Sequence, residues 1–440
     1  MNREKLSAGK IVSVSLMLFA MFFGAGNMIF PPMLGYLSGD KFFQGTLGFV
    51  VSDAGLSVLG VAAIVLVGTK LDDLGKLVGP RFAVFMGALI YLLIGPLFAM
   101  PRTGTVAYEM SVLPFAQNGG SLLASLVFTA AFFGLTYVLC LNPNKLVDIV
   151  GRFLTPILLI SIAVIFIVCV IHPFGEVGTP KGEYAEIPFF KGLIEGYLAL
   201  DGFAALAFAI VVINSIKTMG VTKPERIARY TLISGGLAGI ALALVYLALG
   251  YVGSQTSSGM SFKNGGQILT AVVEGQLGWG GNLVLGLAVL MACLTTSIGL
   301  ASSFADYFHE LFPKWSYRKI LTAVCLFSFA VSNVGLTAMI QFTLPALVMV
   351  YPPVITLVLL SFVKKFIGNS PFPYSIAMIF AFVIGIFDGL KNAGISLGDL
   401  EGVLNAIPFY ELGLGWIIPA AVGAVAGLML KGIGRNRIKN

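Results

Sequence analysis

The stretch Phe22-Phe23-Gly24-Ala25-Gly26-Asn27-Met28-Ile29-Phe30-Pro31-Pro32 lies in the middle of the first long apolar run of the chain. In a membrane span this position would be close to the bilayer midplane, and two glycines within three residues weaken a helix there. Unwound backbone at that depth is stable only where protein buries it or a polar cavity solvates it. The alternative is a continuous helix that packs through its glycines and is kinked by its prolines.

The composition identifies a membrane protein that crosses the bilayer many times. Of the 440 residues, 58% are hydrophobic and only 11% are charged, whereas soluble domains carry about 25% charged residues. The net charge of +7 does not indicate nucleic-acid binding, because the basic residues are spread among short loops. All four cysteines lie in apolar runs without CxxC spacing, so we expect buried thiols and no metal site. The first apolar run is too long for the core of a cleavable signal peptide.

Hydropathy predicts an all-α membrane protein with twelve transmembrane helices, since a span needs at least about 17 apolar residues. The twelve stretches are 9–37, 44–68, 82–113, 120–141, 149–171, 189–215, 229–252, 280–305, 319–339, 341–363, 373–390 and 411–431. Three longer segments between them, 172–188, 253–279 and 391–410, are expected to be loops.

The basic residues predict the orientation. Of the 27 Lys and Arg residues, 21 fall on the side that holds both termini, 5 fall on the other side, and Arg102 lies within a span. Positive loops stay in the cytoplasm. Both termini are therefore expected to be cytoplasmic, in a bacterial inner membrane or a plasma membrane.

A second interruption, Ala199-Leu200-Asp201-Gly202-Phe203, lies in the middle of the sixth span. Five spans separate the two interruptions, so two five-helix units would have opposite orientations in the membrane, as in the inverted repeats of transporters. We expect residues 1–172 to form the first repeat (helices 1–5) and residues 173–370 the second (helices 6–10). Residues 371–440 would form helices 11 and 12 and a cytoplasmic tail.

Three adjacent hydroxyl residues, Thr295-Thr296-Ser297, follow Ala292 in the eighth span. Such hydroxyls usually bond back to carbonyl groups of their own helix or pack against a neighbouring helix. Together with carbonyl groups freed at the first interruption, they could instead replace the water shell of a hard cation.

The pairing of Gly24-Ala25-Gly26-Asn27 with Ala292-x-Leu-Thr295-Thr296-Ser297 resembles the sodium-coupled amino-acid transporters that share the five-plus-five inverted-repeat fold. The whole chain, including Gly95-Pro96-Leu97-Phe98-Ala99-Met100-Pro101-Arg102-Thr103 and Gly196-Tyr197-Leu198-Ala199-Leu200-Asp201, is similar to the bacterial branched-chain amino acid:cation symporter family. This resemblance implies import of leucine, isoleucine and valine driven by sodium, with alternating access around a midplane site.

The resemblance also implies which residues bind. The sodium ion would be held by carbonyl groups of Ala20, Phe23 and Ala292 and by the hydroxyls of Thr295 and Thr296. The amino acid would lie against Gly24, Ala25, Gly26 and Asn27 and against the break formed by Leu200, Asp201, Gly202 and Phe203. The ligands of a second sodium site, known in some relatives, have no match in spans 6 and 7.

Two charged residues inside the spans have alternative roles. Arg102 could hold the substrate carboxylate through its guanidinium fork, or it could form an internal ion pair with Asp53, Glu109 or Asp201. Asp201 could meet the substrate ammonium group, bind a coupling proton, or only balance the charge of Arg102. If Asp201 carries the coupling ion, the protein would be proton-coupled rather than sodium-coupled.

Other classes of membrane protein fit the sequence less well. The chain contains neither HExxH nor a cysteine–histidine cluster. Its one GxSxG string, Gly394-Ile395-Ser396-Leu397-Gly398, falls within the expected loop 391–410 and not at a strand-to-helix turn, where a nucleophilic serine of this motif would lie. A channel would normally carry a repeated filter or ring motif. The sequence therefore predicts a transporter that performs no covalent chemistry.

Overall fold

The computed structural model describes the whole chain except residues 1–4, 69, 117–119, 142–154, 260 and 438–440. The described residues are helical and contain no strand. The α-helices are α1 Ala8–Phe22, α2 Ala25–Ser38, α3 Phe42–Ser52, α4 Ala54–Val67, α5 Leu71–Gly75, α6 Pro80–Leu92, α7 Ala99–Ser111, α8 Leu122–Cys140, α10 Thr155–Ile171, α11 Pro188–Gly196, α12 Asp201–Thr218, α13 Pro224–Ser254, α14 Gly265–Leu311, α15 Tyr317–Ser332, α16 Leu336–Phe362, α17 Lys364–Ile367, α18 Pro371–Asn392, α19 Leu400–Asn405 and α20 Ile417–Arg437.

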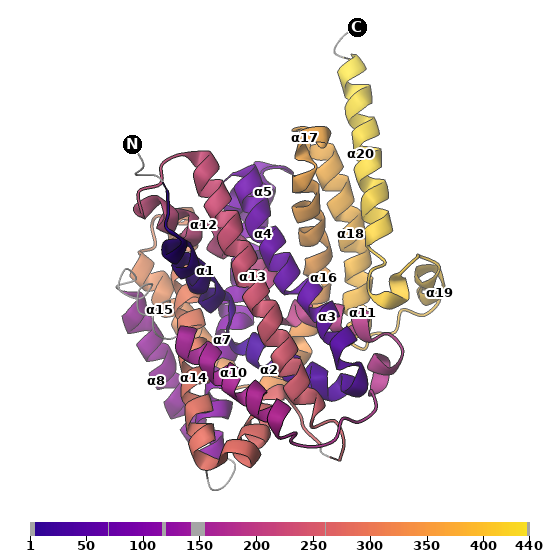
Figure 1. The fold of residues 1–440 in the computed structure, drawn as a ribbon. Coiled ribbons are helices and arrows are strands. Elements are labelled where there is room, and N and C mark those ends of the chain that lie inside the picture. The colour runs from indigo at the N-terminus through magenta and orange to yellow at the C-terminus, as the bar shows by residue number, and fades with distance from the viewer. Residues whose placement is uncertain (1–4, 69, 117–119, 142–154, 260, 438–440) are drawn as a thin grey trace.

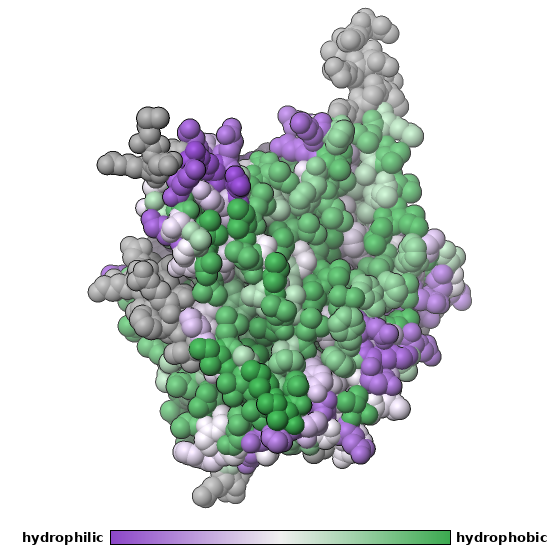
Figure 2. Space-filling model, in the orientation of Figure 1, coloured by the Kyte–Doolittle hydropathy of each residue, from purple (hydrophilic) through white to green (hydrophobic). Residues whose placement is uncertain are grey.

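Helices occupy each of the twelve stretches predicted to span the membrane, with residues 149–154 outside the described part of the chain. Within the described residues, eight helical segments are long and apolar enough to cross a bilayer, and three shorter apolar helices cover Ala8–Phe22, Leu158–Ile171 and Ile417–Leu430. The all-helical class is confirmed, and the number twelve stays a prediction. Hydrophobic residues cover the middle of the face shown in Figure 2, while hydrophilic residues gather toward its ends and along its right edge. This is the distribution expected of a surface that faces lipid.

The helices pack in two groups and a peripheral pair. In the first group, α12 and α13 pack against α4, α11 packs against α3, and α13 also packs against α1 and α2. In the second group, α14 packs against α7, α8 and α15. Outside both, α18 packs between α16 and α20 (Figure 1). Helices α1 and α20 reach the same end of the molecule, as expected if the two termini share one side of the membrane.

Helix α2 meets its neighbours backbone to backbone. A Cβ atom at Gly35 would lie 1.9 Å from the Gly250 carbonyl oxygen, and one at Gly265 would lie 1.8 Å from the Ile29 carbonyl oxygen. A Cβ atom at Gly253 would lie 1.9 Å from the Pro32 carbonyl oxygen. Such close approach requires glycine on the approaching helix.

Two features differ from the sequence-based expectations. The predicted loop 253–279 contains the first turns of α14, which Asn264 caps by accepting a hydrogen bond from the Gln267 N–H at 3.0 Å. This part of α14 is too short to read as a span, and it is helical because Ile268, Leu269 and the two following valines bury one face. The third span is also interrupted, at Gly95 (φ −86°, ψ −117°), between α6 and α7.

Candidate substrate and ion site

The first predicted interruption is present. Helix α1 ends at Phe22, Phe23 and Gly24 are extended, and α2 begins at Ala25. The Gly24 N–H donates to the Asn27 Oδ1 atom at 2.9 Å, so Asn27 caps the helix that it belongs to. The next N–H groups, at the start of α2, have no carbonyl partner one turn earlier in the helix. The break therefore presents bare donors at the positive end of a helix dipole.

The second predicted interruption is also present. A short 3-10 turn, η7 (Tyr197–Ala199), follows α11, and Leu200 has a φ of 74°, after which α12 begins at Asp201. Positive φ is rare for a residue with a branched side chain, and such strain is found mainly where function requires it. Like the first break, this one exposes carbonyl groups at the end of one half-helix and N–H groups at the start of the next.

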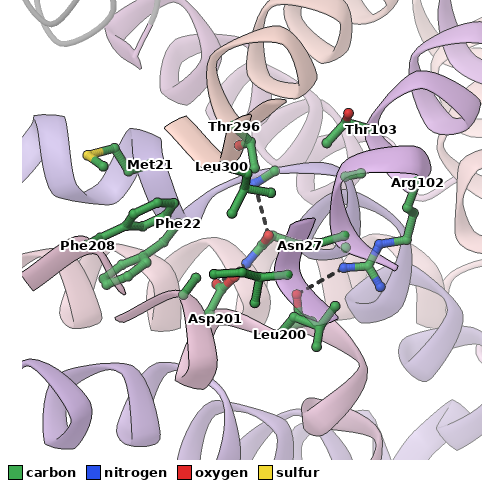
Figure 3. Close-up of a pocket in the computed structure, with 17 residues that line it drawn as sticks. Met21, Phe22, Asn27, Arg102, Thr103, Leu200, Asp201, Phe208, Thr296 and Leu300 are labelled. Carbon is green, nitrogen blue, oxygen red and sulfur yellow. Dashed lines mark hydrogen bonds between the residues drawn. The ribbon is translucent and has the colours of Figure 1, made fainter. Parts of the chain in front are cut away.

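A small cavity lies where the two interruptions meet. Figure 3 shows Met21, Phe22 and Phe208 gathered on one side of it and Arg102 on another, with Asn27 and Asp201 between. The lining is completed by residues of the two breaks, of α7, α12 and α14, and of the interrupted part of the third span, namely Gly24, Ala25, Gly26, Ile94, Ala99, Thr103, Ala199, Leu200, Ala204, Thr296 and Leu300.

Arg102 bonds to the end of the η7 turn. Its Nη1 atom donates to the Leu198 carbonyl oxygen at 2.5 Å, and its Nη2 atom donates to the Ala199 carbonyl oxygen at 3.0 Å. Helix-terminal carbonyl groups carry partial negative charge and attract a guanidinium group. The ion pairs found among the described residues do not include Arg102. Instead of pairing with Asp53, Glu109 or Asp201, Arg102 thus ties α7 to the second break.

Asn27 connects the first break to two carboxylates. Its Nδ2 atom donates to the Asp201 Oδ2 atom and to the Tyr246 hydroxyl oxygen. The Tyr246 hydroxyl in turn donates to Asp53 and lies 3.2 Å from the Asp201 Oδ2 atom. Asp201 lines the cavity, whereas Asp53 and Tyr246 lie behind it.

The residues predicted to hold sodium lie where α14 meets the first break. The Thr296 hydroxyl lies 3.4 Å from the Phe23 carbonyl oxygen, and the Thr295 hydroxyl lies 2.9 Å from that of Ala292. A Cβ atom at Gly24 would lie 2.7 Å from the Thr296 Oγ1 atom, so only glycine allows this approach. Ala20 is buried in the last turn of α1, two residues before its end. The oxygen atoms of Phe23 and Thr296 are thus brought together from distant parts of the sequence.

Seven of the nine residues predicted to contact substrate line the cavity, and Gly202 and Phe203 do not. Both line a neighbouring cavity, where the Phe203 ring stacks on Tyr351 with 4.0 Å between ring centroids.

Sequence reasoning missed several residues that line the cavity. Ala204 and Phe208 follow Asp201 at helical spacings of three and seven, and Leu300 follows Thr296 by four, so each shares a helix face with a predicted site residue. This spacing could have identified them. Tyr246 has no comparable signal, because it lies within an uninterrupted apolar helix.

Known transport proteins match this chain over nearly its whole length. A family model described as "Branched-chain amino acid transport protein" matches residues 7–433. The branched-chain amino acid permease BrnQ of Bacillus subtilis is 41% identical over 97% of this chain and 98% of its own length. The permease of the same name from Escherichia coli K12 is 36% identical over 97% of this chain and 96% of its own length.

Solved structures of other transporters share the fold. A nucleobase-cation-symport-1 family transporter in a closed conformation aligns with a TM-score of 0.61 and 14% identity, over 97% of this chain and 93% of that one. A Na⁺-coupled sialic acid symporter in an outward-open state aligns with a TM-score of 0.59 and 14% identity, over 96% of this chain and 90% of that one. The fold is that of transporters built from two inverted five-helix repeats. The prediction of a transporter rather than an enzyme is confirmed.

Proposed function

Because the chain belongs to the family of branched-chain amino acid transport proteins, we propose that it imports leucine, isoleucine and valine together with sodium. The observation that carries this proposal is the cavity between the two helix breaks. It combines an apolar side with a buried cation and a buried anion. A small apolar amino acid has the complementary distribution of one apolar side chain and two opposite charges.

The substrate carboxylate would face the N-terminus of α2 and Arg102. The N–H groups of Ala25 and Gly26 and the positive end of the helix dipole favour an anion there. The guanidinium group lies beside Gly26, since a Cβ atom on that glycine would be 2.6 Å from the Nη2 atom. The ammonium group would face Asp201, and the side chain would enter the apolar part formed by Met21, Phe22 and Phe208.

Sodium would bind beside this cavity, between the Phe23 carbonyl group and the hydroxyls of Thr295 and Thr296, with carbonyl groups of Ala20 and Ala292 completing its shell. The contact between Thr296 and Phe23 supports this placement, because it brings two neutral oxygen ligands to one point. Neutral oxygens suit a monovalent ion, whereas a divalent ion would require carboxylates. Bound sodium would join α14 to the first break, and in this way it would stabilise the state that binds substrate.

Transport would proceed by alternating access. The first ten of twelve spans would form the repeats 1–172 and 173–370, and the helix group of α1 to α4 with α11 to α13 would rock against the group of α7, α8, α14 and α15. Residues 371–440 would lie outside this movement. The protein would lie in the cell membrane with both termini in the cytoplasm, because the loops on the side of the termini are positively charged.

The decisive test measures linkage between sodium and leucine. Binding of labelled leucine to purified protein would be titrated at several sodium concentrations, with choline as the replacement ion. We expect sodium to raise leucine affinity and leucine to raise sodium affinity by the same factor. The double variant Thr295→Val/Thr296→Val keeps the shape of both side chains and removes their oxygens, so it should lose both effects.

Thr343→Val is the matched control, because Thr343 is a buried threonine of α16 outside the cavity, bonded to the Met339 carbonyl group of its own helix. It should keep the sodium dependence. An unchanged sodium dependence in the double variant would show that sodium binds at another site. Native binding that ignores sodium and strengthens in acid would favour proton coupling, the second candidate, which the buried Asp201 supports.

A further inference from the structure

Behind the cavity, two carboxyl groups from different helices meet around one phenol. Asp53 lies at the junction of α3 and α4 and is 1% exposed, and Asp201 begins α12 and is 3% exposed. Both carboxyl groups lie within hydrogen-bonding distance of the Tyr246 hydroxyl oxygen. Asp53 does not line the cavity, so the proposed leucine site gives this residue no role.

The pair has fewer hydrogen-bond donors than two ionised carboxylates require. A phenol carries one proton and can donate to only one of the two groups. The side-chain amide of Asn27 supplies one further N–H to Asp201, and its other N–H goes to the Tyr246 oxygen. The Asp201 backbone N–H also faces the Asp53 carboxyl group, yet among the described residues the Asp53 Oδ1 atom is buried without a hydrogen-bond partner. An unpartnered buried carboxylate oxygen is costly, whereas a protonated carboxyl carries its own donor.

Among the described residues, one positive charge faces the two carboxyl groups. The groups that face the pair from the surrounding helices are Arg102 of α7, Tyr246 of α13 and Tyr351 of α16. Arg102 is the single cation among them, and its Nη atoms donate to backbone carbonyl groups. Two ionised carboxylates beside one guanidinium group would leave a net negative charge in a buried site. Two negative charges that share one phenol repel each other, which favours the retention of one proton.

The orientation of Asn27 favours a proton over a metal cation between the carboxyl groups. The Gly24 N–H is a donor, so the Asn27 side chain turns its oxygen toward Gly24 and its NH₂ group toward Asp201 and Tyr246. A cation site needs oxygen ligands. Here an N–H group and an O–H group point at the carboxyl groups, which leaves room in the hydrogen-bond pattern for another donor.

We propose that Asp53 is a proton-binding site, and that leucine binds to the state in which Asp53 is neutral and Asp201 alone is ionised. With one proton on the pair, the negative charge of Asp201 offsets the positive charge of Arg102. The bound amino acid is a zwitterion without net charge, so the occupied site stays neutral. The proton site is separate from the sodium site at Thr295 and Thr296. The expected effect of this proton on leucine affinity rests on the proposed function. The existence of the proton-binding site does not.

The proton can be observed without any substrate. Infrared difference spectra of the full chain in lipid nanodiscs, recorded between about pH 6 and about pH 9, would reveal the C=O stretching band of a protonated carboxylic acid. We expect the Asp53→Asn variant to lose a band that titrates in the native protein. Asp388→Asn removes another buried aspartate, on α18 and outside the cavity, and should keep that band. A native spectrum identical to that of Asp53→Asn would overturn the proposal, whatever the substrate.

Leucine affinity then tests the coupling at saturating sodium. If only the protonated state binds, the apparent dissociation constant of the native protein should rise with pH, by up to about tenfold for each pH unit. Asp53→Asn is neutral at every pH, so its affinity should not change with pH. Asp53→Glu restores a titratable group and should restore the pH dependence, which a structural role of Asp53 would not explain.

The outcomes separate this inference from the proposed function. An Asp53 band in a protein that binds no leucine would contradict the proposed substrate and leave the proton site standing. Native affinity independent of pH would overturn the coupling. Loss of sodium dependence in Asp53→Asn, without any Asp53 band in the native protein, would assign the pair to a metal cation and overturn the proton site.

Discussion

Gly26 offers the sharpest single test of the substrate site. A methyl group added there by Gly26→Ala would lie 2.6 Å from the Arg102 Nη2 atom and 3.2 Å from the Ala199 Cα atom. Because the Ala199 backbone cannot yield easily, the guanidinium group must move, and its 3.0 Å bond to the Ala199 carbonyl oxygen breaks. The methyl group would also obstruct the N–H groups at the start of α2. Loss of one charge-assisted contact to the substrate carboxylate costs about 1.5–3 kcal/mol, which weakens leucine binding by about 10- to 150-fold.

The assay is equilibrium binding of labelled leucine to purified protein at saturating sodium, with thermal stability recorded in parallel. Gly134→Ala is the matched control, because Gly134 lies in α8 with nothing within 4 Å of the added methyl group. The control should bind like the native protein. A well-folded Gly26→Ala protein whose affinity is within about twofold of native would refute the placement of the carboxylate, since such a change is worth less than about 0.5 kcal/mol.

Three further changes test other parts of the structure. Arg102→Lys should weaken leucine binding by at least about tenfold, because one ammonium group cannot replace a two-pronged fork; native affinity in a binding assay would exclude contact with the carboxylate. Phe208→Ala should enlarge the apolar side of the cavity and shift preference toward longer side chains by roughly 1–3 kcal/mol per methylene gained, measured by competition between valine and phenylalanine. Gly265→Ala should lower the melting temperature, since its methyl group would overlap the Ile29 carbonyl oxygen and overpacking costs about 1–3 kcal/mol. Gly280→Ala, in the same helix with open space around it, should not.

Both helix breaks could be predicted from the sequence because their causes are local. Gly24 and Gly26 weaken a helix wherever they occur in an apolar run, and the same reasoning located Leu200 next to a charged residue at the centre of a span. Most of the cavity lining follows from these positions. The interruption at Gly95 was missed, although Pro96 follows it, because the two flanking helices form one continuous hydropathy maximum.

Contacts between distant helices could not be predicted in the same way. One of the two roles considered for Arg102 was an internal ion pair, yet its hydrogen bonds go to backbone carbonyl groups that are free acceptors because η7 ends there. The meeting of Asp53 with Tyr246 depends on the relative rotation of α3 and α13. A pattern of residues within either helix carries no information about that rotation.

The close glycine contacts of α2 have a mechanical consequence. Backbone atoms of α13 touch α2 directly at Gly35 and Gly253, so α2 cannot slide or rotate against α13 without immediate overlap, and the two helices must move together. Helix α1 lacks this restraint at Gly9, its one glycine, where nothing lies within 4 Å. We therefore expect the first span to bend at Phe23 and Gly24, where its backbone is not helical. In hydrogen–deuterium exchange, the amides at the end of α1 should open more often than those of α2, although the two half-helices share one span.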